Sequence, residues 1–406
     1  MTAQATQLCI VGGGPAGMMA GLLFARAGVA TIVLEKHGDF LRDFRGDTVH
    51  PSTLRLFSEL GLLDALLTRP HNKVPGIGAY VGGRHLAVAD FSRFDRRWNF
   101  IAMMPQWEFL DFVAGEAAKH PGFSLVMNAE ATGLVEEGGR VHGVRYRQDG
   151  EERAIRSRLV VASDGRRSVL RDGASLPLRS LGAPMDVFWF RLPKQRTSGN
   201  DSTGVFAGGW IIALIDRGDY WQCAYVFAKG QEEALRARGL DAFRSEVAEL
   251  APMVAEQIGA IQSWDELKLL TVAVDRLERW YKPGLLVIGD AAHAMSPIGG
   301  VGINVAVQDA VAAANILAAA LAKGDDPDPL LAKVQQRRMP AVRATQAFQV
   351  AAQQRIIGRL LATSGPVSPA LALRMLDRFA PLRRLPAAFL GFGVRPEHIR
   401  SPEAPL

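Results

Sequence analysis

A glycine-rich turn near the amino terminus constrains the fold most. Residues 8–11 form a short apolar run typical of a buried strand, and an apolar helical pattern begins at Met18. The turn between them places Gly12, Gly14 and Gly17 in the spacing G-x-G-x-x-G, with Ala16 inside it. These glycines permit a tight turn, a close approach to a pyrophosphate and close helix–strand packing, while the helix N-terminus offers free N–H groups. The turn therefore predicts a dinucleotide-binding α/β unit.

A second apolar run supports this interpretation. Residues 31–34 end at Glu35, which lies 18 residues after Gly17, and Lys36 follows it. A carboxylate at this distance is placed to accept hydrogen bonds from a ribose. We assign Glu35 and Lys36 to the cofactor site. A glycine turn in an α/β protein without a cofactor is the alternative, but it leaves Glu35 unexplained.

Two further segments repeat the pattern of a strand followed by small residues. Residues 160–171 contain Asp164-Gly165, and residues 284–293 contain Gly289-Asp290. After Asp290 the chain continues with a loop and then a helix from about Val305; the loop residues that we assign to the cofactor are Pro297, Gly299, Gly300, Gly302, Ile303 and Asn304. Asp290 is suited to accept from sugar hydroxyls, and the glycines let the backbone lie against a flat ring. The segments predict one large cofactor bound at several points.

Composition excludes several other classes. The 406 residues carry a net charge of +6, but the basic residues are spread out and form no nucleic-acid-binding module. The two cysteines, Cys9 and Cys223, form no CxxC pair, which argues against a dithiol flavin reductase and fits a reducing, cytoplasmic compartment. No signal peptide is visible, and no metal site is predicted. The apolar residues 305–322 are interrupted by Gln308, Asp309 and Asn315, so we expect a buried helix.

The pattern along the chain predicts a discontinuous two-domain α/β protein. We expect a Rossmann-like FAD-binding domain with an inserted β-meander, a mixed-sheet substrate domain, and C-terminal helices. The predicted FAD-binding domain comprises residues 1–75, 102–180 and 276–340. The predicted substrate domain comprises 76–101 and 181–275, with strands at 186–192, 209–216, 220–228 and 268–274 and a helix at 231–250. Residues 341–406 are assigned to the C-terminal helices.

The order and spacing of these motifs resemble the group A flavoprotein monooxygenases, the family of para-hydroxybenzoate hydroxylase and the ubiquinone-biosynthesis hydroxylases. The resemblance covers about residues 6–320. It implies that the first glycines hold the FAD pyrophosphate, Glu35 the adenosine ribose, and Asp290 the ribityl chain. It implies that Asp164-Gly165 serves both FAD and the nicotinamide cofactor. Pro297 and the loop 299–304 would line the isoalloxazine, and Arg45 and Gln106 would contact it.

The resemblance also implies the activity. NADH or NADPH would reduce FAD, and a flavin C4a-hydroperoxide formed with O₂ would hydroxylate a small phenolic or N-heterocyclic ring. The chain has no second complete G-x-G-x-x-G unit for the nicotinamide cofactor, which fits this family. Candidate catalytic residues are Arg45, His50 and Pro297; candidate substrate-binding residues are His50, Trp210 and Tyr225. Their plainer interpretations are a surface ion pair for Arg45, a loop hydrogen bond for His50, and core packing for Trp210 and Tyr225.

Other functions share such a fold. They are a quinone-pathway hydroxylase, a halogenase or a reductase, and a non-catalytic protein that binds flavin or another ligand. The W-x-W-x-I-P run of halogenases does not occur in this chain. The basic, apolar residues 382–392 allow peripheral membrane contact, which we do not expect. The sequence leaves the oligomeric state open.

Overall fold

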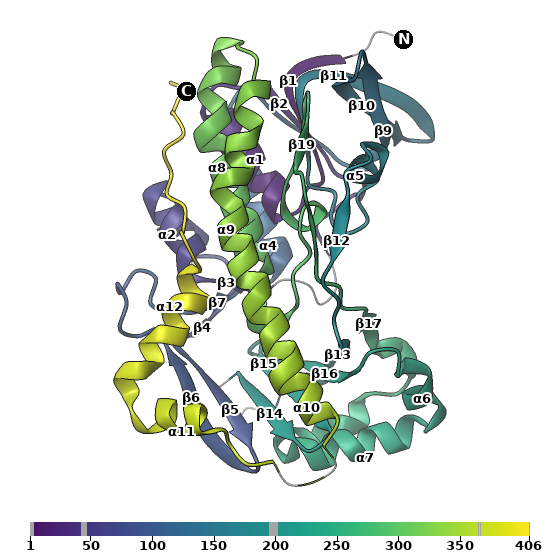
Figure 1. The fold of residues 1–406 in the computed structure, drawn as a ribbon, viewed down its shortest axis with the longest axis vertical. Coiled ribbons are helices and arrows are strands. Elements are labelled where there is room, and N and C mark those ends of the chain that lie inside the picture. Colours follow the sequence, from purple (N-terminus) through teal and green to yellow (C-terminus); the bar gives the residue numbers. More distant parts are fainter. Residues whose placement is uncertain (1–3, 42–46, 195–201, 364, 366, 406) are drawn as a thin grey trace.

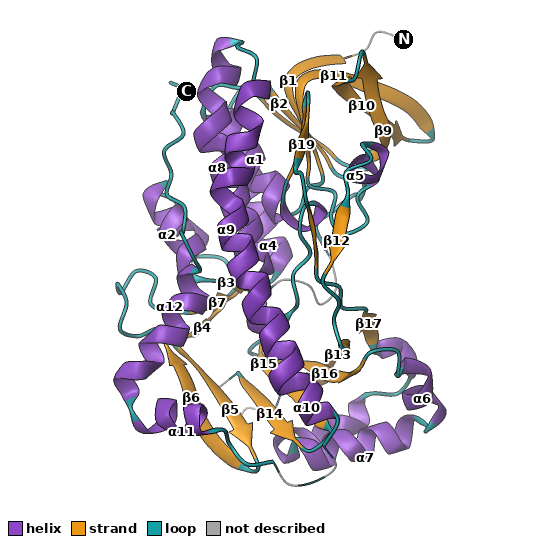
Figure 2. Ribbon diagram, in the orientation of Figure 1, coloured by secondary structure: helices purple, strands orange, loops and turns teal. Residues whose placement is uncertain are grey.

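The computed structural model describes residues 4–41, 47–194, 202–363, 365 and 367–405. Its larger sheet has a parallel core in which β1 is flanked by β2 and β11, as the first glycine motif predicts (Figures 1 and 2). The strands of this core, in spatial order, are β20 (Leu285–Val287), β11 (Glu151–Ala162), β1 (Gln4–Val11), β2 (Thr31–Leu34) and β8 (Phe123–Val126). All three motif turns therefore leave the carboxyl ends of neighbouring strands, where α/β sheets bind ligands.

Helices cover one face of this sheet. They are α1 (Pro15–Arg26), α2 (Pro51–Glu59), α4 (Gln106–Ala117) and α8 (Gly302–Lys323). Residues 298–323 are long and apolar enough to cross a membrane, but α8 is largely buried between its neighbours. It is the buried core helix that the interrupted apolar run predicts.

The predicted β-meander lies at the end of the same sheet. Strand β11 extends beyond the parallel core and pairs antiparallel with β10 (Arg140–Gln148), which pairs with β9 (Glu130–Glu137). The two hairpin turns use Gly138-Gly139 and Asp149-Gly150, all four with positive φ. The long β11 thus joins the meander to the cofactor edge of the sheet.

The second sheet is mixed, as predicted. Its strands, in spatial order, are β17 (Lys268–Leu270), β13 (Met185–Pro193), β16 (Tyr220–Ala228), β15 (Trp210–Asp216), β14 (Thr203–Ala207), β5 (Gly76–Val81) and β6 (Arg84–Asp90). The β14–β5 pair is parallel and the others are antiparallel. The predicted helix 231–250 is two helices, α6 (Glu232–Ala237) and α7 (Leu240–Leu250), because Gly239 at φ +89° separates them.

A long helix crosses the boundary that we predicted at residues 340 and 341. Helix α9 (Asp328–Ala352) continues through the π-helix Gln353–Ile357 into α10 (Gly358–Leu361). It runs from the larger sheet down to the second one (Figure 1). Helices α11 (Leu371–Arg378) and α12 (Arg384–Phe392) follow, and the chain then returns to α1, where the Ala404 N–H donates to the Arg26 carbonyl at 2.9 Å. The observed architecture confirms the predicted fold class.

Candidate active site

Two glycines of the first turn, Gly12 and Gly17, are packed too closely to carry a side chain. A Cβ on Gly12 would lie 2.4 Å from the Ser163 carbonyl oxygen, and a Cβ on Gly17 would lie 1.9 Å from the Gly12 carbonyl oxygen. Gly14 differs, because a Cβ there would meet no atom within 4 Å. Gly14 is also the N-cap of α1 and carries no capping side chain, so the first N–H groups of the helix remain available. This open helix N-terminus is a ready site for a phosphate anion.

The carboxylate of Glu35 closes one side of this turn. It accepts hydrogen bonds from the N–H groups of Gly13 at 2.8 Å and His37 at 3.0 Å, and the His37 ring lies 2.5 Å away. Burial opposes ionisation of Glu35, but the hydrogen bonds from His37 and Gly13 outweigh it and lower the pKa of this carboxyl. Glu35 is therefore an anionic acceptor next to the open helix end, whereas the neighbouring Lys36 is exposed.

The other two motif turns pack directly on the first. The Ser163 hydroxyl donates to the carbonyl oxygens of Val11 and Gly12 at 2.8 and 3.0 Å, and a Cβ on Gly289 would lie 3.0 Å from that of Ala16. Across the turns, Arg166 Nε donates to Asp290 Oδ2 at 3.1 Å. The structure thus brings all three motifs together. Arg166 and Arg171, which the sequence left as part of a charged cluster, both join the second motif to the third, since Arg171 Nη1 donates to the Ala291 carbonyl at 3.3 Å.

Asp164 lies in this group but does not face outward. Its carboxylate accepts from the Ser168 hydroxyl at 2.5 Å and from the Leu170 N–H at 3.4 Å. Burial raises its pKa, and the hydrogen bonds from Ser168 and Leu170 oppose the shift. The side chain stabilises the start of α5 (Val169–Gly173), and its predicted contact with the cofactor remains a prediction. Gly165 continues the turn at φ +83°.

The loop before α8 is held by β3 (Thr48–Val49). The Thr48 hydroxyl donates to the Gly300 carbonyl at 2.7 Å, and a Cβ on Gly300 would meet that hydroxyl at 2.6 Å. Asn304 donates to the carbonyls of Thr48 and Gly300 and accepts from the His50 N–H and the Thr53 hydroxyl. A carboxamide offers two donor hydrogens and two acceptor sites. The side chain of Asn304 is therefore fully used inside the protein, and any contact of this residue with the cofactor, which remains a prediction, would come from its backbone.

The remaining members of this loop keep open positions. Pro297 and Ile303 are half-buried, Gly299 is exposed, and Gly302 begins α8. Gly299 has a positive φ of +76°, so a side chain there would be strained. This stretch presents backbone rather than side chains, as a surface for a flat ring requires.

His50 is the N-cap of α2 and is fully buried. Its ring Nδ1 lies 2.8 Å from the Leu390 carbonyl oxygen, in α12, and its Nε2 has no partner among the described residues. Burial lowers the pKa of His50 to about 4, against the effect of the Leu390 hydrogen bond. A neutral, buried ring bonded to α12 matches the loop-stabilising alternative better than the catalytic one.

Arg45 lies outside the described residues, so its predicted contacts remain a prediction. Near it in sequence, Asp47 accepts from the Gln106 N–H at 3.2 Å and from Arg217 Nη2 at 2.6 Å. Both charged side chains are buried, at 9% and 4% exposure. This pair joins the start of α4 to the turn between β15 and β16, so Gln106 lies where the two domains meet. No pattern in the sequence connects Asp47 with Arg217.

Trp210 and Tyr225, which the sequence predicts to bind substrate, match the alternative of core packing better. Both pack in the cluster against α7, and the Tyr225 hydroxyl donates to Glu246 of that helix. The opposite face carries Trp189, Ala213 and Ala224, and Ile298 of the cofactor loop packs against it. Successive residues of a strand point to opposite faces. The face toward the cofactor loop therefore carries Ala224 and Val226, the residues before and after Tyr225 in the sequence.

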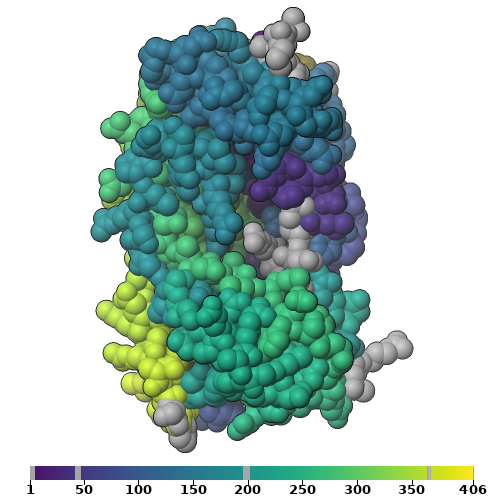
Figure 3. All heavy atoms as spheres, turned by 90° about the vertical axis from the view of Figure 1, so that its right-hand side faces the viewer, coloured from purple at the N-terminus to yellow at the C-terminus, as the bar shows by residue number. Residues whose placement is uncertain are grey.

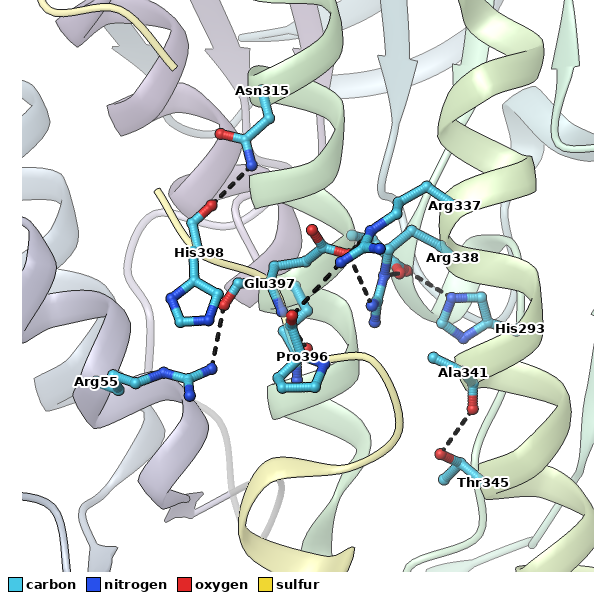
Figure 4. A network of polar contacts seen from close by, with 12 residues as sticks. Arg55, His293, Asn315, Arg337, Arg338, Ala341, Thr345, Pro396, Glu397 and His398 are labelled. Atoms are coloured by element: carbon cyan, nitrogen blue, oxygen red, sulfur yellow. Dashed lines mark hydrogen bonds and ion pairs between the residues drawn. The ribbon is translucent and has the colours of Figure 1, made fainter. Parts of the chain in front are cut away.

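A cluster of buried charged side chains, which includes Arg338 and Glu397, packs against the third motif (residues 284–293) through His293 (Figure 4). Asp309 accepts from the Gly289 N–H at 3.2 Å and from Arg338 Nε at 2.9 Å, and His293 Nε2 lies 2.5 Å away. Burial opposes ionisation of Asp309, but His293 and Arg338 outweigh it and lower its pKa. Glu397, near the end of the described chain, accepts from Arg338 Nη1 at 3.3 Å. The sequence signal for this cluster was the lone Asp309 in an apolar helix.

The arrangement fits FAD. Gly14 leaves room for a pyrophosphate at a helix end, Glu35 offers an acceptor for a ribose, and Asp290, 37% exposed, lies at the same edge of the sheet, after β20. The surface is hollowed between the upper part of the molecule, coloured purple and blue, and the lower green part (Figure 3). Within the described ranges, no group of three or more His, Cys, Asp or Glu side chains is placed to hold a metal ion.

Comparisons with known proteins agree with this site. A family model described as an FAD binding domain matches residues 5–349. The chain is 32% identical over 389 residues to 6-methylpretetramide 4-monooxygenase of Streptomyces rimosus, which covers 94% of this chain and 92% of that protein. The crystal structure of PqsL, described as a probable FAD-dependent monooxygenase from Pseudomonas aeruginosa, has a TM-score of 0.76 at 22% identity over 88% of this chain and 98% of that one. The myxobacterial chondrochloren halogenase CndH shares the fold at a TM-score of 0.75 and 18% identity, over 95% of this chain and 89% of that one.

Proposed function

Because this chain belongs to the FAD-binding family of flavoprotein aromatic monooxygenases, we propose that it hydroxylates a multi-ring phenol with NADH or NADPH and O₂. The relative that is 32% identical along almost its whole length is named for the 4-hydroxylation of 6-methylpretetramide. The sequence leaves phenolic and N-heterocyclic rings open, and this relative is the reason for proposing a phenol of the size class of its substrate.

One observation supports the proposal most. Ile298, in the loop assigned to the flavin ring, packs on the sheet face formed by Trp189, Ala213 and Ala224 with other apolar side chains. An apolar, partly aromatic wall suits a flat ring system, since pockets for small molecules are lined mainly by such side chains. The wall therefore favours a substrate that is bound largely by apolar contact.

The chain's own residues have distinct tasks in this proposal. The α1 N-terminus holds the pyrophosphate, Glu35 accepts from the adenosine ribose, and Asp290 accepts from the ribityl hydroxyls. Bound FAD supplies the redox chemistry, taking a hydride from the nicotinamide cofactor and activating O₂. The loop 297–302 orients the flat ring through its backbone, and the apolar wall excludes water from the reacting atoms. Arg166, 32% exposed beside Asp290, is a cation that a nicotinamide phosphate would approach.

The remaining features follow from this assignment. The partners are the aromatic substrate, O₂ and the nicotinamide cofactor, with no nucleic acid and no stable membrane attachment. We propose a cytoplasmic location, which the two unpaired, buried cysteines favour.

The test is the aerobic oxidation of NADH and of NADPH by the FAD-loaded protein, with and without a panel of naphthols, hydroxyanthrones and simple phenols. We expect one multi-ring phenol to stimulate oxidation and to yield a product one oxygen atom heavier. Oxidation stimulated only by simple phenols would contradict the size class. No stimulation and no hydroxylated product from any member, despite bound FAD, would favour a non-catalytic flavoprotein.

A further inference from the structure

Two glutamines of α9 and the first residue of the π-helix that continues it form a row that faces the flavin loop. Gln346, Gln349 and Gln353 follow one another at spacings of three and four residues, so they lie on one side of the helix. Their side chains are buried, with relative exposures of 0%, 0% and 1%. Buried carboxamides require hydrogen-bond partners, and here each glutamine has a partner among residues 294–298, directly before the Gly299-Gly300 turn, while Gln346 also bonds to Asp275 and Arg276.

The central glutamine makes the largest number of these bonds. Gln349 Oε1 accepts from the Ser296 N–H at 3.1 Å, and its Nε2 donates to the carbonyls of Ser296 at 2.9 Å and Ile298 at 3.1 Å. Residues 293–297 belong to no helix or strand. Within this segment the Ala294 carbonyl accepts from the Asp275 N–H at 3.4 Å, and Gln349 supplies the hydrogen bonds of the Ser296 backbone that a neighbouring strand would otherwise make.

The outer glutamines extend the row in both directions. Gln346 Nε2 donates to the carbonyls of Ala294 at 3.1 Å and Asp275 at 2.6 Å, and Asp275 begins β18 (Asp275–Leu277), through which the chain returns from the second sheet. Gln353 Nε2 contacts the Ser296 hydroxyl at 2.8 Å. A hydroxyl both donates and accepts, so one end of the Gln353 carboxamide stays unpaired among the described residues in either orientation.

The row also relates the loop to the substrate wall. The π-helix begins at Gln353, and one turn later Ile357 packs in the cluster that contains Ile298 and Trp189. Single π-helical turns occur frequently at functional sites. One continuous helix therefore contacts the flavin loop with its glutamines and the substrate wall with its end.

We propose that Gln346, Gln349 and Gln353 are positioning residues, which hold Pro297 and the Gly299-Gly300 turn in register with the isoalloxazine and the apolar wall. This inference rests on the proposed function, because it takes the loop 297–302 to be the isoalloxazine surface. Loss of the central hydrogen bonds would let the loop shift relative to the wall without removing any group that touches the pyrophosphate or the ribose. The row thus affects the environment of the ring more than the retention of the whole cofactor.

The experiment compares Gln349→Met with Thr345→Val in the FAD-loaded protein. Thr345 is a matched control, because it is buried in the same helix and its hydroxyl donates only to the Ala341 carbonyl, at 2.9 Å (Figure 4). We expect Gln349→Met to shift the visible absorbance bands of bound FAD and to weaken FAD binding by about tenfold, the effect of losing a net one to two hydrogen bonds. Thr345→Val should leave both readouts at the wild-type values.

A second variant keeps the test decisive if Gln349→Met does not fold. Gln353→Met removes only the contact with the Ser296 hydroxyl, and we expect a smaller shift of the same absorbance bands. Wild-type spectra and FAD affinity in both glutamine variants, or equal changes in Thr345→Val, would overturn the inference. Wild-type protein that binds FAD but hydroxylates none of the phenols would instead contradict the proposed function, and the spectral comparison would still stand.

Discussion

The cofactor edge of the larger sheet and the substrate wall of the second sheet, as proposed, depend on different parts of the chain. At the cofactor edge the backbone shapes the site, because Gly12 and Gly17 leave no room for a Cβ and Gly14 leaves its helix end open, and the carboxylates of Glu35 and Asp290 add to it. At the wall the contacts are made by side chains, and these alternate between the two faces of the sheet along each strand. Tyr225 and its neighbour Ala224 therefore belong to opposite clusters. A site formed by backbone can be predicted even when the limits of a strand are misjudged by a residue. A site formed by side chains cannot, because a shift of one residue exchanges the two faces of the strand.

The sharpest test of the backbone site compares Gly17→Ala with Gly14→Ala. The new Cβ of Gly17→Ala would lie 1.9 Å from the Gly12 carbonyl, so we expect a loss of several kcal/mol of stability, on the order of 4 kcal/mol, and no FAD binding. Gly14→Ala has free space and should keep the wild-type Tm while its methyl group hinders the pyrophosphate. Thermal unfolding of the apoproteins and FAD titration separate the two effects. If Gly14→Ala binds FAD as well as the wild-type protein does, the assignment of the pyrophosphate to this helix end is wrong.

This contrast also explains how far the sequence could be used. The positions of Gly12, Glu35 and Gly289-Asp290 after strands, and of Gly17 in the first turn of α1, were predictable because they depend on the order of strand, turn and helix; their contacts with the cofactor remain predictions. For Asp164 and Asn304 the sequence did not show which hydrogen bonds their side chains make inside the protein. Arg217 and Gln349 gave no signal, because their partners lie far away along the chain. The second sheet was predicted, but not which of its faces meets the loop.

Behind the cofactor edge, Arg338→Met should cost almost as much as Gly17→Ala. It would leave Asp309 charged and fully buried with one partner fewer, which typically costs about 3–5 kcal/mol. Arg337→Met is the control, because its guanidinium is 41% exposed where it pairs with Glu397, and we expect a loss of at most about 1 kcal/mol. Chemical denaturation measures both. Equal losses in the two variants would show that the buried charge adds nothing to the support of the third motif.

The pH dependence of stability probes the junction at His50. Its pKa is lowered by burial from 6.5 to about 4, so the unfolded chain binds the proton more readily. Stability from this group is complete above pH 6.5 and is lost as the pH falls toward 4, by about 3 kcal/mol, since each pKa unit corresponds to about 1.4 kcal/mol. His50→Gln should flatten this part of the profile of unfolding free energy against pH. If His50→Gln leaves the profile of unfolding free energy against pH unchanged, a group other than His50 causes the loss of stability between pH 6.5 and 4.

Within the cofactor edge, Asp290→Ala and Asp164→Asn should separate a ligand contact from a structural one. Asp290 is partly exposed and pairs only with Arg166 among the described residues, so its loss should weaken FAD binding by roughly tenfold to a hundredfold with little change in Tm. Asp164→Asn weakens the bonds from Ser168 and Leu170, and we expect about 1–2 kcal/mol of stability to be lost with FAD affinity nearly unchanged. The reverse pattern would exchange the two assignments.

The smallest effects should come from the two faces of the second sheet, and they address the comparison most directly. Tyr225→Phe removes the hydroxyl that donates to Glu246, which should cost about 1 kcal/mol of stability and leave substrate KM unchanged. Ala213→Leu adds volume to the wall that Ile298 contacts, and we expect the KM for the active phenol to rise several-fold while FAD affinity is retained. Steady-state kinetics and thermal unfolding of both variants give the answer. If Tyr225→Phe changes KM and Ala213→Leu does not, the substrate binds the sheet face that packs against α7. The packing of Ile298 would then stabilise the loop without contributing to substrate binding.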